Sequence, residues 1–505
     1  MSLSLLCLIG FLFAIASVAL SANIDPQQVH IALAGNDGSG NSNGMSVMYM
    51  TEDDTSETMI KYGTTSGDYT FSATGTSSSY WKTFHHSVGI KELKPATTYY
   101  YVVGDSSTNT WSKEFSFISA PLAQDLRSFS FNVFADLGDA QKKHYGGPTI
   151  EYVGEHLAED DIKLVWHGGD VGYADDSFLH HGCYTKFCYE EVFDSYMSLV
   201  QDSWASHVPY MVAVGNHEAD CHSPDCMFSK EKREKLSNFT AYNTRFHMPS
   251  AESNGTLNMH YSFNYGNVHF VSIDSETGYP GAQEEKRYVM PCGGFGDQLS
   301  WLEADLIKAN QNRAAQPWIL VQGHRPMYGD KGINVKFQQA MEELFYKYGV
   351  DVYFSGHEHY YVRNYPVYQG VIDEKKYDNP RFTTHLMIGG SGNDEMKDIQ
   401  RKLEEEETER KAFNIVDPSP GDNDIQIARN YKDLLEGKYD KSEYVEPKDG
   451  DNPWVVTSDK DNHVGIGKVT IINDNELLFE YIRTKSSEVH DSFTLKRDHS
   501  ISYPR

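Results

Sequence analysis

The chain has 505 residues and a formal net charge of −28, from 44 basic and 72 acidic side chains. This acidic balance argues against binding a nucleic-acid backbone through a basic surface. An anionic substrate would depend on local positive charge, which bound metal ions can supply. The length predicts two or three domains.

The first residues are similar to a secretory signal peptide. The run 3–20 is almost wholly apolar, and small residues follow at Ser21 and Ala22. We expect a signal peptide over residues 1–22 that is removed from the mature chain, with a membrane anchor as the alternative. No later stretch approaches the roughly 20 apolar residues that span a bilayer. We therefore expect no membrane association after removal, and the sequence indicates no oligomeric state.

Cysteine spacing fits an oxidising compartment. Beyond the predicted signal peptide the cysteines are Cys183, Cys188, Cys221, Cys226 and Cys292. The first four form two close pairs that suit short-loop disulfides, with a zinc site as the alternative, and the fifth has no close partner. Sequons at Asn238 and Asn254 predict glycosylation, as expected for a secreted protein.

Residues 23–122 show short strand-like runs separated by turns rich in Gly, Ser, Thr, Asn and Pro. The runs are Val29–Ala34, Met45–Thr51, Thr58–Gly63, His86–Ile90, Thr98–Gly104 and Lys113–Ser119. About seven short strands in this length are typical of a β-sandwich of the immunoglobulin or fibronectin type. Because the region has no cysteine pair, a fibronectin III-like sandwich is preferred.

Residues 126–394 follow a different pattern, in which apolar runs alternate with longer polar segments. The runs are Phe129–Ala135, Ile162–Trp166, Val208–Val214, Val268–Ile273, Trp318–Val321, Val350–Phe354 and His385–Ile388. Helix candidates between them are Gly147–Leu157, Asp297–Ala309 and Val335–Tyr348. This alternation predicts a layered α/β domain with two sheets flanked by helices. The chain is thus expected to be a two-domain protein of mixed α+β and α/β class.

Residues 395–452 form a charged, mostly acidic segment that is poor in apolar side chains. A solvated helix with a flexible loop is the simpler interpretation, and a regulatory or partner-binding arm is the alternative. Strand-like runs then return at Lys468–Ile472, Leu477–Tyr481 and Ser492–Lys496. We expect residues 453–505 to complete the α/β domain.

Five apolar runs of the α/β domain lead into residues that can bind metals. The five endings are Asp136-Leu137-Gly138, Gly169-Asp170-Val171-Gly172-Tyr173, Gly215-Asn216-His217-Glu218, Gly323-His324-Arg325-Pro326 and Gly356-His357-Glu358-His359. Ligands of α/β sheets bind at the carboxyl ends of strands, so these endings predict one convergent metal site. One carboxylate, Asp170, can bridge two ions, and paired ions are a known arrangement for phosphate-ester hydrolysis.

These blocks resemble the metallophosphoesterases, and specifically the purple acid phosphatases. The resemblance extends from Pro26 to about Phe493 and includes the segment Arg245-Phe246-His247-Met248-Pro249. Many other metallophosphoesterases carry a histidine at the position of Gly138 and lack the tyrosine found here at Tyr173. The resemblance implies a high-molecular-weight acid phosphatase that is secreted, lysosomal or vacuolar.

The resemblance also implies the site residues. A ferric ion would be held by Asp136, Asp170, Tyr173 and His359. A divalent ion (zinc, iron or manganese) would be held by Asp170, Asn216, His324 and His357. Small phosphate monoesters would be hydrolysed with metal-bound hydroxide as nucleophile. Asn216 and His217 would bind the phosphate, His217 would assist catalysis, and Glu218 is a candidate to orient His217.

Two alternatives stay open at this point. The same metal scaffold serves phosphodiesterases and nucleotide pyrophosphatases, since specificity lies in loops outside the blocks. A binding protein with a degenerate site is disfavoured because the ligand set is intact. The loop after His324 also lacks the additional substrate-binding histidines of plant members. Arg325 or Tyr328 are candidates to contact phosphate in their place, and the residue that protonates the leaving group is left open.

Overall fold

The computed structural model describes residues 22–35, 42–123, 125, 127–138, 146–159, 161–175, 187–221, 226, 228–282, 290–396, 444–445, 452–461 and 463–500. Residues 1–21 of the predicted signal peptide, Cys183 and most of the charged segment 395–452 lie outside these residues. Among the described helices, none combines the length and apolar character needed to cross a bilayer.

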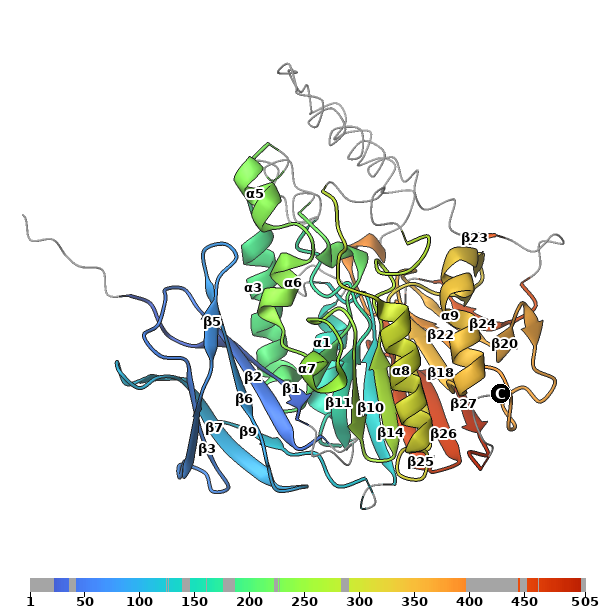
Figure 1. Ribbon diagram of the computed structural model, residues 1–505, viewed down its shortest axis with the longest axis horizontal. Helices are drawn as coiled ribbons and strands as arrows, with labels where there is room; N and C mark the ends of the chain where they lie inside the picture. Colours follow the sequence, from blue (N-terminus) through green and yellow to red (C-terminus); the bar gives the residue numbers. More distant parts are fainter. Residues whose placement is uncertain are drawn as a thin grey trace, which may run out of the picture.

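Two antiparallel sheets form the N-terminal β-sandwich, drawn in blue in Figure 1. One sheet has the strand order β1-β2-β6-β5, and the other has the order β4-β3-β7-β8 with β9 also paired to β7. The strands are β1 (Gln27–Ala34), β2 (Gly44–Thr51), β3 (Met59–Gly63), β4 (Phe71–Thr74), β5 (Thr76–Ser78), β6 (Phe84–Ile90), β7 (Thr98–Asp105), β8 (Thr110–Trp111) and β9 (Phe115–Ile118). The six predicted runs all lie on these strands, and the three unpredicted strands are short.

Alternate residues of β7 form the centre of the sandwich core. Tyr99, Tyr101 and Val103 are buried there with Phe115 and Phe117 of β9. The Tyr101 ring lies 5.6 Å from that of Phe115 and 5.7 Å from that of Phe117. Period-two burial of aromatic and β-branched side chains is what stabilises such a sheet pair.

Two larger sheets form the second domain. The first has the order β12-β11-β10-β25-β26-β27, and the second has the order β13-β14-β15-β18-β22-β19-β24. The first sheet contains β10 (Phe129–Phe134), β11 (Ile162–His167), β12 (Tyr210–Val212), β25 (Gly465–Asn473), β26 (Glu476–Arg483) and β27 (Glu488–Lys496). The second contains β13 (Tyr261–Tyr265), β14 (Val268–Ser272), β15 (Trp318–Gln322), β18 (Val352–Ser355), β19 (Tyr361–Asn364), β22 (Thr384–Ile388) and β24 (Val455–Asp459).

Aromatic side chains pack the two sheets against each other. Trp166 of the first sheet lies edge-to-face on Phe270 and Phe354 of the second, at centroid distances of 5.0 and 5.8 Å. Phe131 also meets Phe270, at 5.2 Å. These strands are buried on both faces and are mostly apolar along their length, although β10 also buries Ser130 and Asn132. The two-domain fold predicted from the sequence is thereby confirmed.

Helices cover the outer faces of the two sheets. The longer ones are α1 (Gly147–His156), α3 (Tyr189–Val200), which continues into the π turn η1 (Gln201–Ala205), α8 (Gln298–Gln311) and α9 (Val335–Tyr348). Leu302 of α8 and Phe337 of α9 belong to one buried hydrophobic cluster with Val271 and Val321 of the second sheet. The Asn334 side chain caps α9 by accepting from Phe337 N at 3.2 Å, and Gly349 ends the helix at φ 66°.

Short elements complete the described fold. The helical turns are η2 (Asn216–Glu218), α5 (Lys230–Lys235), α6 (Thr240–Arg245), α7 (Ser250–Ser253) and η3 (Asp394–Met396). The short strands are β16 (Tyr328–Gly329), β17 (Gly332–Asn334), β20 (Val367–Tyr368), β21 (Val371–Ile372) and β23 (Tyr444–Val445). The last of these belongs to the charged segment and pairs with β17.

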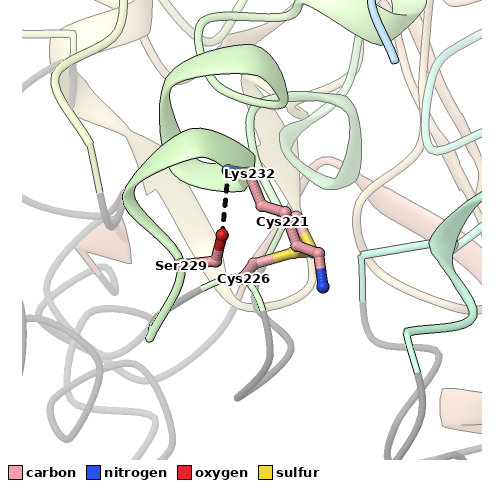
Figure 2. The surroundings of a disulfide bond; sticks show 4 residues. All are labelled: Cys221, Cys226, Ser229 and Lys232. Atoms are coloured by element: carbon pink, nitrogen blue, oxygen red, sulfur yellow. Dashed lines mark hydrogen bonds between the residues drawn. A yellow bond between two sulfur atoms is a disulfide. The ribbon is translucent and has the colours of Figure 1, made fainter. Parts of the chain in front are cut away.

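A disulfide joins Cys221 and Cys226, as the sequence spacing predicted (Figure 2). Nearby, the Ser229 side chain caps α5 by accepting from Lys232 N at 3.3 Å. Cys188 is also disulfide-bonded. Cys292 is a buried thiol whose Sγ lies 3.4 Å from the backbone oxygen of Met290. These bonds fit the expectation of an oxidising compartment.

Buried histidines couple the stability of the fold to pH. His86 is enclosed in the sandwich, where its ring nitrogens lie 2.8 Å from Thr51 Oγ1 and 2.7 Å from Thr58 Oγ1. Burial lowers the pKa of His86 to about 4. The native ring is therefore neutral, whereas the unfolded chain binds a proton below about pH 6.5. Stability from this residue is fully present above pH 6.5 and is lost as pH falls toward 4.

We expect His86→Gln to flatten the acid branch of the stability profile. Glutamine keeps polar contacts to both threonines but does not titrate. The free energy of unfolding of the wild type should fall by roughly 3 kcal/mol more than that of the variant between pH 7 and pH 4. Urea unfolding at a series of pH values measures this difference. Parallel profiles for the two proteins would show that His86 does not carry the effect.

Candidate metal centre

The five predicted blocks meet at one end of the two large sheets. Three of them follow β10, β11 and β12 of the first sheet, and two follow β15 and β18 of the second. Backbone hydrogen bonds tie the loops together, since Asp136 N donates to Gly169 O at 3.1 Å and Gly356 N donates to His324 O at 2.7 Å. The site therefore lies between the sheets, at the carboxyl ends of their strands.

Four of the seven predicted ligands have left-handed backbone conformations. Their φ angles are 61° at Asp136, 52° at Asp170, 51° at Tyr173 and 70° at His357. Such values are uncommon for residues with a Cβ atom and cost about 1–3 kcal/mol each. Strain of this kind concentrates at functional sites, where the surrounding structure maintains it.

Two glycines allow the loops to approach the carboxylates closely. A Cβ atom at Gly215 would lie 2.2 Å from Asp170 Oδ1. A Cβ atom at Gly356 would lie 2.2 Å from Asp136 Oδ2. Both distances are far below van der Waals contact, so glycine is a steric requirement at these two positions.

The first group of donor atoms surrounds the Tyr173 phenol oxygen. This oxygen lies 3.1 Å from Asp136 Oδ1, 3.0 Å from His359 Nε2 and 3.4 Å from Asp170 Oδ2. Burial, followed by the charge of Asp136, raises the pKa of Tyr173 well above 10. Ionisation of this phenol therefore requires a strong cation beside it.

The second group surrounds the side-chain oxygen of Asn216. It lies 3.1 Å from His324 Nε2 and 2.9 Å from His357 Nδ1. Asp170 Oδ2 is 2.9 Å from the same His324 nitrogen. Asp170, His324 and His357 thus offer donor atoms that all lie within 4.8 Å of one another, an arrangement that suits a metal ion.

The donor set fits a pair of metal ions. Asp136, Asp170 and His324 are all at most 1% exposed. Burial opposes the ionisation of Asp170, but the charges of His324 and His217 and their hydrogen bonds hold its pKa below the usual range. Buried carboxylates need compensating positive charge. Carboxylate, phenol, amide and imidazole donors suit iron, zinc and manganese.

His217 is oriented by a residue that the sequence did not single out. Its Nδ1 lies 2.9 Å from Asp175 Oδ2, and its ring packs on Tyr173 at a centroid distance of 4.2 Å. Its backbone N–H donates to Asp170 Oδ1 at 2.8 Å. Asp175 is fully buried and stands only two residues after Tyr173, so its position in the second block was the available signal.

Glu218 has a different role from the one expected. Its carboxylate accepts from the backbone N–H groups of Asp170, Val171 and Gly215 at 2.9, 2.7 and 2.8 Å. Glu218 thus joins the second block to the third through backbone hydrogen bonds. The residue that contacts the His217 ring is Asp175 instead. Acidic side chains that accept several backbone N–H bonds rigidify such loops.

A sixth strand end also contributes to the site. Asn393, in the loop after β22, donates from Nδ2 to the backbone oxygen of Asp136 at 3.0 Å. Glu395 Oε2 lies 3.7 Å from His359 Nδ1. This loop contains Gly392-Asn393 after β22, a pair like Gly215-Asn216 of the third block, so a signal was present that the sequence analysis did not use.

Three family models match the chain in sequence. They are the purple acid phosphatase N-terminal domain over residues 26–119, the calcineurin-like phosphoesterase over 129–361, and the iron/zinc purple acid phosphatase-like C-terminal domain over 436–492. Fold and site together define a calcineurin-like phosphoesterase with an N-terminal β-sandwich.

Similar proteins of known name identify the family within this class. Acid phosphatase A of Cryphonectria parasitica is 33% identical over 426 residues, which cover 73% of this chain and 81% of the relative. Purple acid phosphatase 22 of Arabidopsis thaliana is 33% identical over 380 residues, which cover 74% and 73%. The fold matches a purple acid phosphatase from yellow lupin seeds with a TM-score of 0.67 at 22% identity, over 95% of this chain and 76% of that one. The chain belongs to the purple acid phosphatase family.

Proposed function

We propose that this chain is an acid phosphatase that hydrolyses phosphate monoesters at two metal ions. The central observation concerns Asp170 Oδ2, which lies 2.9 Å from His324 Nε2 and 3.4 Å from Tyr173 Oη. One carboxylate oxygen thereby links the two donor groups, as a ligand shared by two ions must. Membership of the purple acid phosphatase family supports the monoesterase over the diesterase alternative.

Each ion has a proposed set of ligands. Ferric iron would be held by Asp136, Asp170, Tyr173 and His359. The divalent ion (zinc, iron or manganese) would be held by Asp170, Asn216, His324 and His357. The phenol favours the trivalent ion on the first set, because a hard anionic oxygen needs a strongly charged partner.

The chemistry divides between the ions and the protein. Bound ions of this kind polarise a phosphoryl group and lower the pKa of water. The protein holds the donors rigidly, and Asp175 fixes the His217 ring 3.9 Å from Asp170 Oδ2, measured at Nε2. From there His217 donates to the phosphate or to the leaving oxygen, and Asn216 also faces the substrate. A positioned general acid contributes typically about 10²–10⁴-fold to the rate.

Secretion or delivery to a lysosome or vacuole fits the molecule. Support comes from the apolar N-terminal run, the Cys221–Cys226 disulfide and the two sequons. Asn254 is exposed at the end of α7 and is the better glycan acceptor. Asn238 is half-buried, and its side-chain oxygen already accepts from Gly293 N at 2.8 Å.

Hydrolysis of an aryl phosphate monoester and of the matching diester across pH 3 to 9 tests the proposal. We expect monoester turnover with an optimum below neutral pH and slower diester turnover, measured by release of the phenol. Faster turnover of the diester would favour the phosphodiesterase alternative. No monoester turnover in a metal-replete sample would overturn the proposed function.

A further inference from the structure

The loop after His324 holds two candidates for an additional contact to phosphate, and the structure separates them. The Tyr328 hydroxyl is committed elsewhere, because it donates to Glu342 of α9 and accepts from Gln338 Nε2 at 2.6 Å and Gly370 N at 3.1 Å. Its side chain is 1% exposed. Tyr328 therefore packs α9 and the β20–β21 turn together, and its hydroxyl does not face the metal centre.

Arg325 presents two edges of its guanidinium to different partners. Nε and Nη2 both donate to Glu276 Oε2, at 2.9 and 2.7 Å. On the other edge, Nη1 donates to His357 Nε2 at 2.9 Å, and Nη2 lies 3.4 Å from Asn216 Oδ1. One edge is thus anchored on a carboxylate, and the other faces two proposed ligands of the divalent ion.

Glu276 is held in place by a rigid loop after β14. Its N–H donates to Asp274 Oδ1 at 2.8 Å, as does the N–H of Thr277 at 2.9 Å. Ser275 Oγ accepts from Arg325 N at 2.8 Å, so the loop binds both the backbone and the side chain of the arginine. Glu276 is 1% exposed. A buried carboxylate in such a loop fixes the orientation of its cationic partner.

We propose that Arg325 binds the phosphoryl group of the substrate through its Nη1–Nη2 edge and that Glu276 is its positioning residue. This inference rests on the proposed function, since it needs a phosphate ester beside Asn216 and His357. If Asn216 and His357 bind the divalent ion, a phosphate ester on that ion would lie next to them. The Nη1–Nη2 edge of Arg325, which already contacts both residues, would then face the oxygens of the ester. Its charge is permanent, whereas that of the site histidines depends on protonation.

The planar fork explains why the residue is arginine. A guanidinium can bind a carboxylate with one edge and two phosphoryl oxygens with the next, which an ammonium group cannot match. Lysine at this position would keep the charge opposite Glu276 and lose the second edge. Arg325→Lys is therefore the informative variant, because it avoids leaving Glu276 without a cation in the interior.

Calorimetric titration of the metal-loaded enzyme with inorganic phosphate tests the proposal. We expect Arg325→Lys to weaken phosphate binding by about tenfold to a hundredfold, since hydrogen bonds to charged groups contribute that much. The Michaelis constant for an aryl phosphate should rise with it. Glu276→Gln, which keeps the arginine but loosens it, should weaken phosphate binding by roughly threefold to tenfold. Tyr328→Phe is the matched control, and its affinity should stay within about twofold of wild type.

Metal content, measured on the same samples by mass spectrometry, separates the outcomes. Weaker phosphate binding with two metal ions retained per chain supports the proposal. Wild-type phosphate affinity in Arg325→Lys overturns it, and so does loss of the divalent ion from that variant, which would make Arg325 a support of the metal ligands. In either case, monoester turnover by the wild type would leave the proposed function standing.

Discussion

Replacement of Asp170 by asparagine should lower kcat for an aryl phosphate by about a thousandfold or more. Asp170 Oδ2 contacts both donor groups, at 2.9 Å from His324 Nε2 and 3.4 Å from Tyr173 Oη. An amide offers one neutral oxygen and turns two N–H donors toward neighbours that must bind cations. A metal ion contributes several kcal/mol to transition-state stabilisation, and each 1.36 kcal/mol is a factor of ten in rate.

The measurement is kcat together with the metal content of the purified variant, which should fall below two ions per chain. Asp305→Asn is a suitable control. Asp305 is also buried, but it lies on α8, where it accepts from Ser262 Oγ at 2.7 Å and pairs with His269 at 2.8 Å. Its variant should keep turnover within a few-fold of wild type. Full activity in Asp170→Asn would show that this carboxylate does not bridge the ions.

Replacement of Arg245 by methionine should destabilise the protein by about 3–5 kcal/mol. Arg245 is 2% exposed and lies at the boundary between the sandwich and the second domain. Its Nη1 donates to Gln28 Oε1 at 3.0 Å and its Nε donates to Tyr80 Oη at 2.9 Å, both in the sandwich. Its Nη2 pairs with Glu190 and Asp194 of α3 at 3.0 and 2.8 Å.

Arg245→Met should be strongly destabilising because it removes the cation that pairs with Glu190 and Asp194. Burial, only partly offset by Arg245, already raises the pKa of Glu190. Without the guanidinium, the buried Glu190 carboxylate would lose its cation and keep the charge of Asp194, 26% exposed, on the same helix beside it. Figure 1 shows the blue sandwich beside α3 and α6, which are the elements that this arginine joins. Urea unfolding, followed by tryptophan fluorescence, measures the change.

A second ion pair across the same boundary provides the control. Lys113 Nζ lies 3.0 Å from Asp202 Oδ1, but the two side chains are 65% and 66% exposed. Exposed pairs contribute at most about 1 kcal/mol, so Lys113→Met should have little effect on unfolding. Equal destabilisation by the two substitutions would show that burial does not set how much each of these ion pairs contributes to stability.

The strands and their endings were readable from the sequence because burial on both faces produces continuous apolar runs. The rule that ligands gather at carboxyl ends of strands then predicted that the five block endings converge, and the resemblance to the purple acid phosphatases implied which seven residues in them are ligands. The same approach missed β4, β5 and β8, which are short and lie largely outside the core, and it also missed β13, β19 and β24 of the second large sheet. In β5 all three residues are exposed polar side chains, so it carries no apolar signal.

Residues that position the proposed metal ligands or contact the substrate were harder to predict from the sequence. Glu276 contacts Arg325 through side-chain geometry, and nothing in its local sequence distinguishes it from a solvated acid. Asp175 had one sequence signal, its place two residues after Tyr173, but its contact with His217 depends on tertiary packing. The sequence predicted a contact to phosphate from either Arg325 or Tyr328 and did not decide between them. The direction of a side chain in the loop after a strand depends on the loops that surround it. Such second-layer contacts are created by tertiary packing, which periodicity and spacing do not encode.

The left-handed backbone at Asp136, Asp170, Tyr173 and His357 has a consequence for protein engineering. Glycine adopts these φ angles without steric cost, but it has no side chain that could bind a metal. A library screened only for resistance to heat would therefore enrich glycine where the chemistry requires a donor atom. Selection for robustness and selection for turnover oppose each other at these four positions, and a useful screen must apply both.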